Sequence, residues 1–372
     1  MKINIASFGG RSHLLDLARE LSELGHEVRF YSFVPDKRAK HFGLHPKNNY
    51  SYFLVALPFI ALMRLTKQAI WSEFLFQITF DYYTAWFSRP CDVFIGQSPM
   101  HLYSLKYLKR KYGAVTVLER GNSHVLDEVE VLSRNPRYKG KTAKPKFIIS
   151  RDLRGYKTAD YISIASDHVR RSFIKNGIPN QKLLINPYGV STIDFRPTEL
   201  TKENPYDILM VGQWSFRKGS DLLIKLCERT GYRLLHVGPI VDMEFPDASN
   251  MDHVDAVDQR KLIEFYKKAK IFVLPSREEG LAMVQLQAII CGLPLVCSKY
   301  TGGRDLKSFI SDPKWIVEMD EYSLKSLEQN VTEALALAAS QIGIRKYIDL
   351  ESISEFSWNA YGKRYHENLL KL

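Results

Sequence analysis

The sequence contains little cysteine, and its few cysteines are not spaced for a metal site. Cys91, Cys227, Cys291 and Cys297 are scattered over 372 residues without a Cys-x-x-Cys pair. This pattern excludes a zinc site and a disulfide framework, and it favours reduced thiols in a cytoplasmic protein. The N-terminal stretch MKINIASFGG leads directly into strand-like sequence, so we expect no signal peptide.

Long hydrophobic runs are also missing. The longest run, YFLVALPFIALM over Tyr52–Met63, has twelve residues and is interrupted by Pro58. A membrane-spanning helix needs about 20 apolar residues, so this run is too short to cross a bilayer. It fits either a helix segment within a core or an apolar patch at a membrane interface, since Arg64 and Lys67 follow it.

Acidic residues are scarce in the first half of the chain. Residues 1–200 carry 30 Lys or Arg against 17 Asp or Glu, a net charge of +13, whereas residues 201–372 carry 22 against 24. A basic half beside a near-neutral half suggests that one domain meets an anionic partner. A lipid surface and a phosphorylated substrate fit this charge. Nucleic acid is disfavoured, because the sequence shows no nucleic-acid-binding motif.

The basic residues concentrate between Arg134 and Arg154, where eight Lys or Arg accompany one acidic residue, Asp152. A solvated loop would give the same composition. We nevertheless predict that this segment contacts an acceptor or an anionic membrane. The residues that we assign to this contact are Arg134, Arg137, Lys139, Lys141, Lys144 and Lys146.

Strand-like and helix-like segments alternate in two successive series. The first series contains KINIASF, HEVRFYSF, DVFIG, AVTVLE, YISIA and LLINP, and the second contains YDILMVG, RLLHVG, IFVLPS and LPLVCS. Two such series predict two α/β domains, each a doubly wound and mostly parallel sheet. The polar, proline-bounded stretch Asp194–Pro205 marks the boundary, which gives a first domain over residues 1–197 and a second over 198–350.

Four polar segments follow predicted strands, and ligands bind at the carboxyl ends of such strands. They are GGRSH (9–13), RGNSH (120–124), GQWSFRKG (212–219) and SREEG (276–280). Gly9-Gly10 permits close approach of a ligand to the backbone, although a tight turn explains it equally well. The G-x-G-x-x-G pattern of a standard dinucleotide site is missing.

Cations and a carboxylate stand at the ends of the second-series strands. Arg217 and Lys218 open a helix and suit a diphosphate, although a solvated turn is the plain alternative. Glu279 lies in a loop, and Gln287 lies two turns into the helix that we expect from Met283 to Gly292. An elongated ligand can touch both side chains. An acidic surface loop is the alternative for Glu279.

Two further features carry weaker signals. His124 follows the strand AVTVLE in a polar loop, where a lone histidine is more often a packed or solvent-facing residue than a catalytic one. The stretch DHVDAVD contains three regularly spaced carboxylates, but Asp258 fits an N-cap and no Asp-x-Asp motif is present. We therefore expect no catalytic metal.

The sequence resembles the retaining GT-B glycosyltransferases of family 4. The marks of this resemblance include FGGRSHLLDLARELSELGHEVRFYS, ERGNSH, VGQWSFRKGSDLL, AKIFVLPSREEGLAMVQLQAIICGLPLVCSKYTGGRDL and FSWNAYGKRY. The resemblance implies two Rossmann-like domains that face each other across a cleft, the first binding the acceptor and the second the nucleotide sugar. A C-terminal helix over residues 351–372 is expected to cross back to the first domain.

By this resemblance, Glu279 faces the donor sugar, Gln287 meets the nucleotide ribose, and Lys218 with Arg217 neutralises the diphosphate. His124 matches the active-site histidine. The loop residues that complete the predicted donor site are Gly10, Gly280, Leu281, Ala282, Gly302 and Gly303. The chain departs from the family pattern at Gln287, where a second Glu is usual, and at Gln213, where many members have Arg.

The resemblance implies metal-independent transfer of a hexose, with retention of configuration, from a nucleotide diphosphate sugar to a glycan or lipid-linked glycan. We expect a UDP-sugar, with a GDP-sugar as the alternative, and a role in cell-surface polysaccharide synthesis. The nucleotide sugar acts as co-substrate, and no cofactor is expected. The protein is expected in the cytoplasm or peripherally at the inner face of the membrane. A binding-only homologue and a GT-B nucleotide-sugar epimerase are the rival interpretations.

Overall fold

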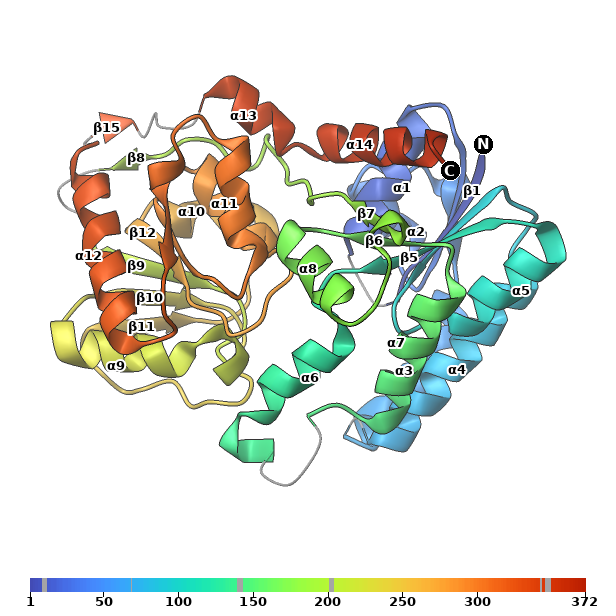
Figure 1. Cartoon of the computed structure of the whole chain (residues 1–372), viewed down its shortest axis with the longest axis horizontal. Coiled ribbons are helices and arrows are strands. Elements are labelled where there is room, and N and C mark those ends of the chain that lie inside the picture. The colour runs from blue at the N-terminus through green and yellow to red at the C-terminus, as the bar shows by residue number, and fades with distance from the viewer. Residues whose placement is uncertain (9–11, 68, 139–142, 201–203, 342, 345–348) are drawn as a thin grey trace.

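The computed structural model describes residues 1–372 apart from 9–11, 68, 139–142, 201–203, 342 and 345–348. Two α/β domains lie side by side (Figure 1). The first is built on a seven-stranded parallel sheet in the order β3-β2-β1-β4-β5-β6-β7. Its strands are β1 (Lys2–Ala6), β2 (Glu27–Ser32), β3 (Asn49–Ser51), β4 (Val93–Gln97), β5 (Val115–Arg120), β6 (Tyr161–Ile164) and β7 (Leu183–Ile185).

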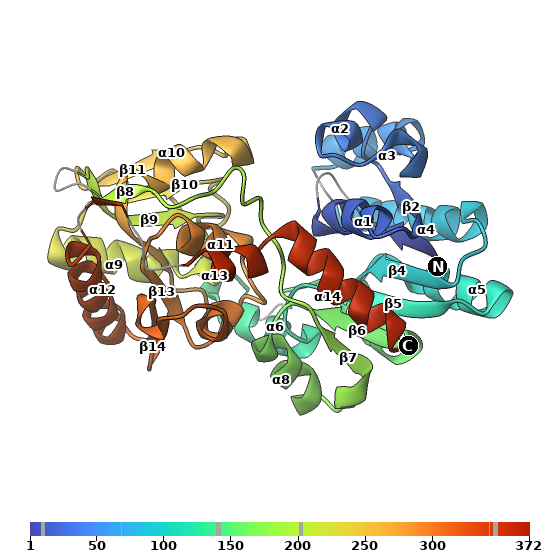
Figure 2. The same ribbon diagram turned by 90° about the horizontal axis from the view of Figure 1, so that it is seen from above.

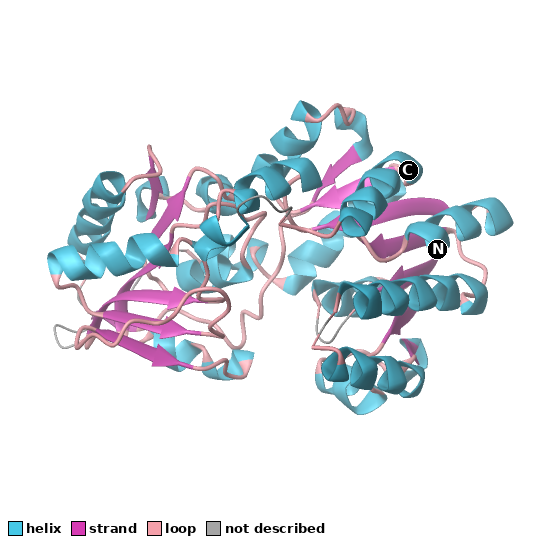
Figure 3. Ribbon diagram, turned by 90° about the horizontal axis from the view of Figure 1, so that it is seen from below, coloured by secondary structure: helices cyan, strands magenta, loops and turns pink. Residues whose placement is uncertain are grey.

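Helices flank this sheet on both faces (Figure 3). Helix α1 shows why they do so, because its apolar residues recur at helical spacing and Leu14, Leu17 and Leu21 are all buried. The helices of the first domain are α1 (His13–Glu23), α2 (Asp36–His41), α3 (Phe53–Leu65), α4 (Ile70–Phe87), α5 (Leu102–Tyr112), α6 (Val125–Ser133), α7 (Lys146–Thr158) and α8 (Asp167–Lys175).

The second domain has a six-stranded parallel sheet in the order β11-β10-β9-β12-β13-β14. Its strands are β9 (Tyr206–Val211), β10 (Leu234–Val237), β11 (Met251–Val254), β12 (Ala269–Leu274), β13 (Leu295–Ser298) and β14 (Ile316–Met319). Its helices are α9 (Ser220–Thr230), α10 (Ile263–Tyr266), α11 (Met283–Ile290) and α12 (Leu324–Ala339). A small antiparallel pair joins β8 (Glu199–Leu200) to β15 (Gly343–Ile344).

After α13 (Leu350–Glu355), the last helix, α14 (Trp358–Leu370), returns to the first domain and lies along α1 (Figure 2). Gly362 permits this close approach, because a Cβ there would collide with the side chain of Glu20. The guanidinium of Arg364 donates to the carbonyl of Pro187 at 3.0 Å. The C-terminal helix therefore fastens the second domain to the first.

The structure confirms the predicted strands and describes two stretches whose structure the sequence left open. The stretch that contains DHVD forms β11, at the edge of the second sheet, and Asp252 pairs with Arg233 at 3.8 Å. Residues 52–63 fit each of the two interpretations in part, because Tyr52 and Ala56 are buried in the core while Phe59, Ile60 and Met63 pack against it half-buried. Ala56 is the only buried residue of α3, so most of this apolar helix faces outward.

Candidate active site

The carboxyl ends of the two sheets face each other through three loops. The amide of Ser123, after β5, donates to Oε1 of Glu278, after β12, at 3.1 Å. The hydroxyl of Ser166, before α8, donates to the carbonyl of Gly280 at 2.9 Å. A side chain at Gly280 would collide with the carbonyl oxygen of Gly121, so the two backbones pack directly on each other. The segments predicted at strand ends therefore meet between the domains.

A cation–carboxylate cluster occupies this junction. The ammonium of Lys218 forms an ion pair with Glu279, and both side chains are almost fully buried. Nη1 of Arg217 lies 3.3 Å from Glu279 and 3.5 Å from Glu278. Burial opposes ionisation of Glu279, but Lys218 and Arg217 outweigh it and lower its pKa. Glu279 is therefore a carboxylate at neutral pH.

Glu278 differs from its neighbour in electrostatics. Burial, reinforced by the nearby carboxylate of Glu128, raises the pKa of Glu278 despite Arg217. Its Oε1 accepts from the amide of Ser123, which lies in the other domain. Glu278 thus links the domains, whereas Glu279 is held by cations.

The segment that carries the two cations is a short 3₁₀ helix, η4 (Phe216–Lys218), between β9 and α9. The Ser215 hydroxyl caps it by accepting from the amide of Lys218 at 3.4 Å. Gly219 follows with φ of 79°, and a side chain there would collide with the carbonyl of Pro275. Glycine is required at this position for both reasons.

Arg277 fastens η4 to the loop after β12, and the sequence analysis did not single it out. Its guanidinium stacks on the Phe216 ring at 3.6 Å and pairs with Asp221 at 2.6 Å. Its amide donates to the carbonyl of Arg217 at 2.8 Å. The adjacency of Arg277 to Glu278 in SREEG was the only sequence signal for this role.

His124 caps α6 at the end of the β5 loop. Its Nδ1 accepts from the amide of Leu126 at 3.4 Å, which leaves the ring proton on Nε2. The ring packs against Tyr156 and Phe173, with centroids 4.9 and 5.2 Å away. Burial lowers the pKa of His124 to about 4. At neutral pH it is an uncharged hydrogen-bond donor.

A buried ion network supports the His124 loop. Arg120 pairs with Glu128 and Asp152, and its Nη2 donates to the carbonyl of Ser123 at 3.1 Å. Lys144 lies 2.7 Å from the same carboxylate of Glu128. Burial opposes ionisation of Glu128, but Arg120 and Lys144 lower its pKa to about 2. Lys144 thus belongs to this network, and its contact with an external partner stays a prediction.

Gln287 lies where the sequence predicted, in the second turn of α11, and is buried. Its amide oxygen accepts from the hydroxyl of Tyr266, in α10, at 3.1 Å. The same hydroxyl lies 3.0 Å from the carbonyl of Val284. The amide oxygen of Gln287 therefore already accepts from a protein group.

The two predicted donor loops are joined to each other. The amide of Gly302 donates to the carbonyl of Glu279 at 3.2 Å, at the start of the 3₁₀ helix η6 (Gly302–Phe309). A side chain at Gly302 would collide with the carbonyl of Gly280, and one at Gly303 with the amide group of Gln285. Leu281 and Ala282 are buried in the same loop.

The remaining predicted residues fall outside this junction or outside the described residues. Gly10, Lys139 and Lys141 lie outside the described residues, as does the side chain of Arg137. Arg134 is exposed and pairs with Glu130 on its own helix at 2.8 Å. Lys146, at the start of α7, is exposed.

A cavity of about 310 Å³ lies beside the junction. Val131 and Arg134 line it from α6 in the first domain, and Arg277, Tyr300 and Tyr322 line it from the second. Across the same gap, Asn135 donates to Asp242 at 3.3 Å. The space between the domains therefore opens next to the loops that hold Arg217 and Glu279.

The chain shares its architecture with known glycosyltransferase structures. Sucrose-phosphate synthase from Thermosynechococcus elongatus is similar with a TM-score of 0.68 and 15% identity, over 99% of this chain and 98% of that one. HepE from Anabaena, in complex with UDP-glucose, is similar with a TM-score of 0.60 and 13% identity, over the full length of both chains. Residues 191–336 match the family model of group 1 glycosyl transferases. The chain therefore has the GT-B fold, and residues 191–336 are similar to group 1 glycosyl transferases.

Sequence similarity to curated proteins covers less of the chain. A stretch of 156 residues is 26% identical to D-inositol 3-phosphate glycosyltransferase of Acidothermus cellulolyticus. This stretch covers 34% of this chain and 35% of that relative. The chain thus spans about a third of that relative's length in this match. The group 1 match begins at residue 191, before β9, and therefore includes η4, the β12 loop, α11 and η6.

Among the described residues, no helix is long and apolar enough to cross a membrane. The same residues hold no group of three or more histidine, cysteine or acidic side chains placed to bind a metal ion.

Proposed function

We propose that this GT-B protein is a retaining glycosyltransferase of the family 4 type. In this proposal it transfers a hexose from a nucleotide diphosphate sugar to a glycan or lipid-linked glycan. The observation that carries the proposal is the buried cluster of Lys218, Arg217 and Glu279 at the facing strand ends. Two cations and a carboxylate at this edge suit a donor that combines a diphosphate with a sugar.

The cluster suggests how the leaving group is stabilised. As the bond between the sugar and the diphosphate breaks, negative charge grows on the phosphate oxygens. Lys218 is fixed by burial and by the η4 cap, and Arg217 is held by Glu278 and Glu279, so both stabilise that charge with little reorganisation. We propose that these cations, rather than a bound metal ion, balance the diphosphate. No cofactor beyond the nucleotide sugar enters the proposal.

Glu279 and His124 would act on the sugar. A diphosphate that takes over Lys218 releases Glu279 to accept from sugar hydroxyls, beside the positive charge that develops on the ring. The neutral His124 would donate through Nε2 to the sugar or to the acceptor. For retention we propose front-face attack. The acceptor oxygen bonds to the anomeric carbon as the phosphate leaves, and the leaving phosphate oxygen takes the acceptor proton.

A panel of nucleotide sugars tests the proposal. We favour a UDP-sugar, because the similar structure of HepE contains UDP-glucose, and a GDP-sugar is the alternative. Donor turnover measured with a carbohydrate acceptor, together with the anomeric configuration of the product, decides both activity and retention. Binding of a nucleotide without hydrolysis or transfer would instead establish the binding-only rival.

Gln287 offers a narrower test of the nucleotide site. We expect Gln287→Ala to weaken nucleotide binding by about 1–2 kcal/mol, the value of one neutral hydrogen bond whose partner is left unpaired. Gln287→Glu should bind as well or better, because a carboxylate accepts from the ribose more strongly. Isothermal titration with the nucleotide measures both variants. Tyr266→Phe is the matched control, since it removes the contact to the Gln287 oxygen and leaves the amide in place. Normal binding by Gln287→Ala would place the ribose elsewhere.

We also propose that the protein works in the cytoplasm and docks peripherally at the inner face of a membrane, in the assembly of a cell-surface polysaccharide. The net charge of +13 over residues 1–200 and the outward-facing apolar helix α3 support this proposal. Each basic residue near an anionic leaflet contributes about 1 kcal/mol of attraction.

Flotation with liposomes tests the docking. We expect the protein to float with vesicles that contain phosphatidylglycerol, and to float less as salt increases. Lys146→Glu should reduce flotation. Lys225→Glu makes an equal charge change at an exposed position of α9, in the second domain, and should leave flotation nearly unchanged. Flotation that depends neither on anionic lipid nor on salt concentration would contradict docking through the basic segment.

A further inference from the structure

The first domain contains an apolar pocket of about 590 Å³ that is separate from the cation–carboxylate cluster. Its apolar lining consists of Phe8, Val34, Phe53, Ile60, Met63 and Phe76, together with Phe33 and Pro35. The volume falls within the roughly 300–1,000 Å³ of sites that hold small ligands. The pocket is therefore large enough for part of an organic molecule.

The pocket lies at the ligand-binding edge of the sheet. Phe8 follows β1, and its amide donates to Oε1 of Gln97, at the end of β4, at 2.9 Å. Phe33 follows β2, and its ring lies 5.3 Å from that of Phe8 and from that of Phe76. Phe8 also directly precedes Gly9-Gly10 in the sequence, which the resemblance assigns to the donor diphosphate. An occupant of this pocket would extend from the place expected for the acceptor.

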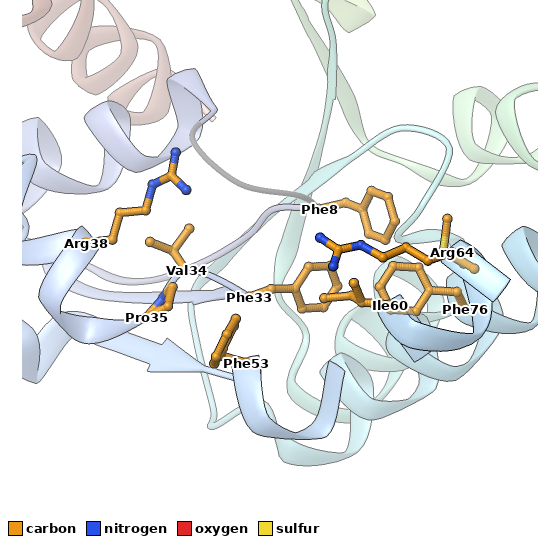
Figure 4. A pocket seen from close by; sticks show the side chains of 10 residues that line it. Phe8, Phe33, Val34, Pro35, Arg38, Phe53, Ile60, Arg64 and Phe76 are labelled. Atoms are coloured by element: carbon orange, nitrogen blue, oxygen red, sulfur yellow. The ribbon is translucent and has the colours of Figure 1, made fainter. Parts of the chain in front are cut away.

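Within the part of the chain that the structure describes, two arginines are the only charged residues that line the pocket. Arg38 comes from α2 and Arg64 from the last turn of α3, and both are exposed. In the view of Figure 4, Arg38 lies near Val34, and the guanidinium of Arg64 lies among Phe8, Phe33 and Ile60. No acidic side chain lines the pocket among the described residues. An anionic group is the complement of this rim.

The surface around the pocket is apolar as well. Leu54 is 79% exposed, Leu65 is 82% and Trp71 is 56%, all on α3 or α4. Monomeric proteins rarely leave such contiguous apolar surface in water, and it is typical of a contact with protein or lipid. Ordinary solvation does not explain a helix of which only Ala56 is buried.

From these observations, we infer that the pocket holds the hydrocarbon chain of the acceptor, a single-chain lipid with a phosphate-type head that Arg38 and Arg64 bind. The inference rests on the proposed function and names the acceptor class for it. The apolar surface of α3 and α4 contacts the membrane from which this lipid enters. A long-chain glycan acceptor without lipid would explain neither the apolar pocket nor the exposed apolar surface of α3 and α4.

Binding of soluble short-chain probes tests this inference without enzymatic activity. The probe is farnesyl phosphate below its micelle concentration, with farnesol and inorganic phosphate as the chain-only and head-only controls. We expect farnesyl phosphate to bind at least tenfold more tightly than either control, because only it engages both the pocket and the arginines. If farnesol binds as tightly as farnesyl phosphate, the arginines do not contribute to binding. If inorganic phosphate binds as tightly, the apolar pocket does not contribute.

Paired variants locate the binding. Ile60→Trp, which fills the pocket, should weaken farnesyl phosphate binding at least tenfold, whereas Leu54→Trp, on the exposed side of the same helix, should not. Arg64→Gln should weaken it about tenfold, the scale of one charge-assisted hydrogen bond, whereas Lys67→Gln, an equal charge loss nearby, should not. Unchanged thermal unfolding confirms that each variant folds. Because Arg64 is exposed, its variant remains informative if Ile60→Trp does not fold.

The outcomes separate this inference from the proposed function. Normal binding by both Ile60→Trp and Arg64→Gln overturns the inference. Binding to phospholipid vesicles without binding to monomeric farnesyl phosphate also overturns it, and leaves α3 and α4 as a membrane contact only. If the protein transfers sugar to a lipid-free glycan and does not bind farnesyl phosphate, the proposed function stands and the inference is wrong. A protein that binds farnesyl phosphate but no nucleotide loses the proposed function instead.

Discussion

Glu279→Ala should lower donor turnover by roughly 10²–10³-fold, equivalent to about 3–4 kcal/mol of lost transition-state stabilisation. Glu279 is a buried carboxylate beside Lys218 and Arg217, so it stands where positive charge develops on the donor ring. A contact that strengthens in the transition state affects turnover far more than donor affinity.

The affinity of Glu279→Ala for the donor should rise or stay unchanged, although its turnover falls. The carboxylate competes with the diphosphate for Lys218, so its removal leaves the cation available to the nucleotide. Kinetics with a saturating donor, together with titration of the nucleoside diphosphate, separate the two effects. Glu279→Gln is the matched control, because it keeps the shape and the acceptor oxygen but removes the charge. Near-normal turnover in Glu279→Ala would remove this residue from the mechanism.

The sequence predicted the parts of the site that depend on strand ends. Alternating strands and helices fix a parallel sheet, and a parallel sheet brings every strand's carboxyl end to one edge. The predicted segments around Ser123, Lys218 and Glu279 consequently meet in the structure. The end of α11 was also predictable to within two residues, since Gly292, with φ of 81°, stops the helix soon after Ile290.

Contacts across long sequence separations were not predictable. Glu128 and Lys144 join Arg120 beneath His124, and no spacing rule relates these residues. Arg277 acts through the Phe216 ring, which comes from another strand end. Such partners depend on how the loops fold over the sheet edges. The pattern indicates that the loops carry function but not which side chains pair within them.

The exposure of α3 shows a different limit. An apolar helix in a sequence has the same composition whether its faces contact a core or a membrane, so residues 52–63 left both interpretations open. Only the packing settles the question. Helix α3 buries Ala56 fully and packs Phe59, Ile60 and Met63 against the core, whereas Leu54 and Leu65 are exposed. Burial is a property of the whole domain, which a local pattern does not contain.

Lys218→Ala should weaken binding of the nucleoside diphosphate by about 1.5–3 kcal/mol, a factor of roughly 10–100, and leave binding of the nucleoside nearly unchanged. The Lys218 side chain is buried at the start of α9, beside Arg217, so it is placed to contact a diphosphate and not a base. Isothermal titration of UDP and of uridine measures the difference. Lys218→Arg, which retains the charge, should recover part of the affinity for UDP.

The same substitution should also destabilise the fold, and the two effects can be separated. Without Lys218, the buried carboxylate of Glu279 keeps only Arg217 as a partner, and removing one member of a buried ion pair costs about 3–5 kcal/mol. The double variant Lys218→Ala with Glu279→Ala removes the unpaired carboxylate. It should therefore recover much of the thermal stability while its affinity for UDP remains low. Recovery of UDP affinity together with stability would show that Lys218 acts only by supporting the fold. Equal weakening of UDP and uridine in the single variant would contradict a diphosphate contact.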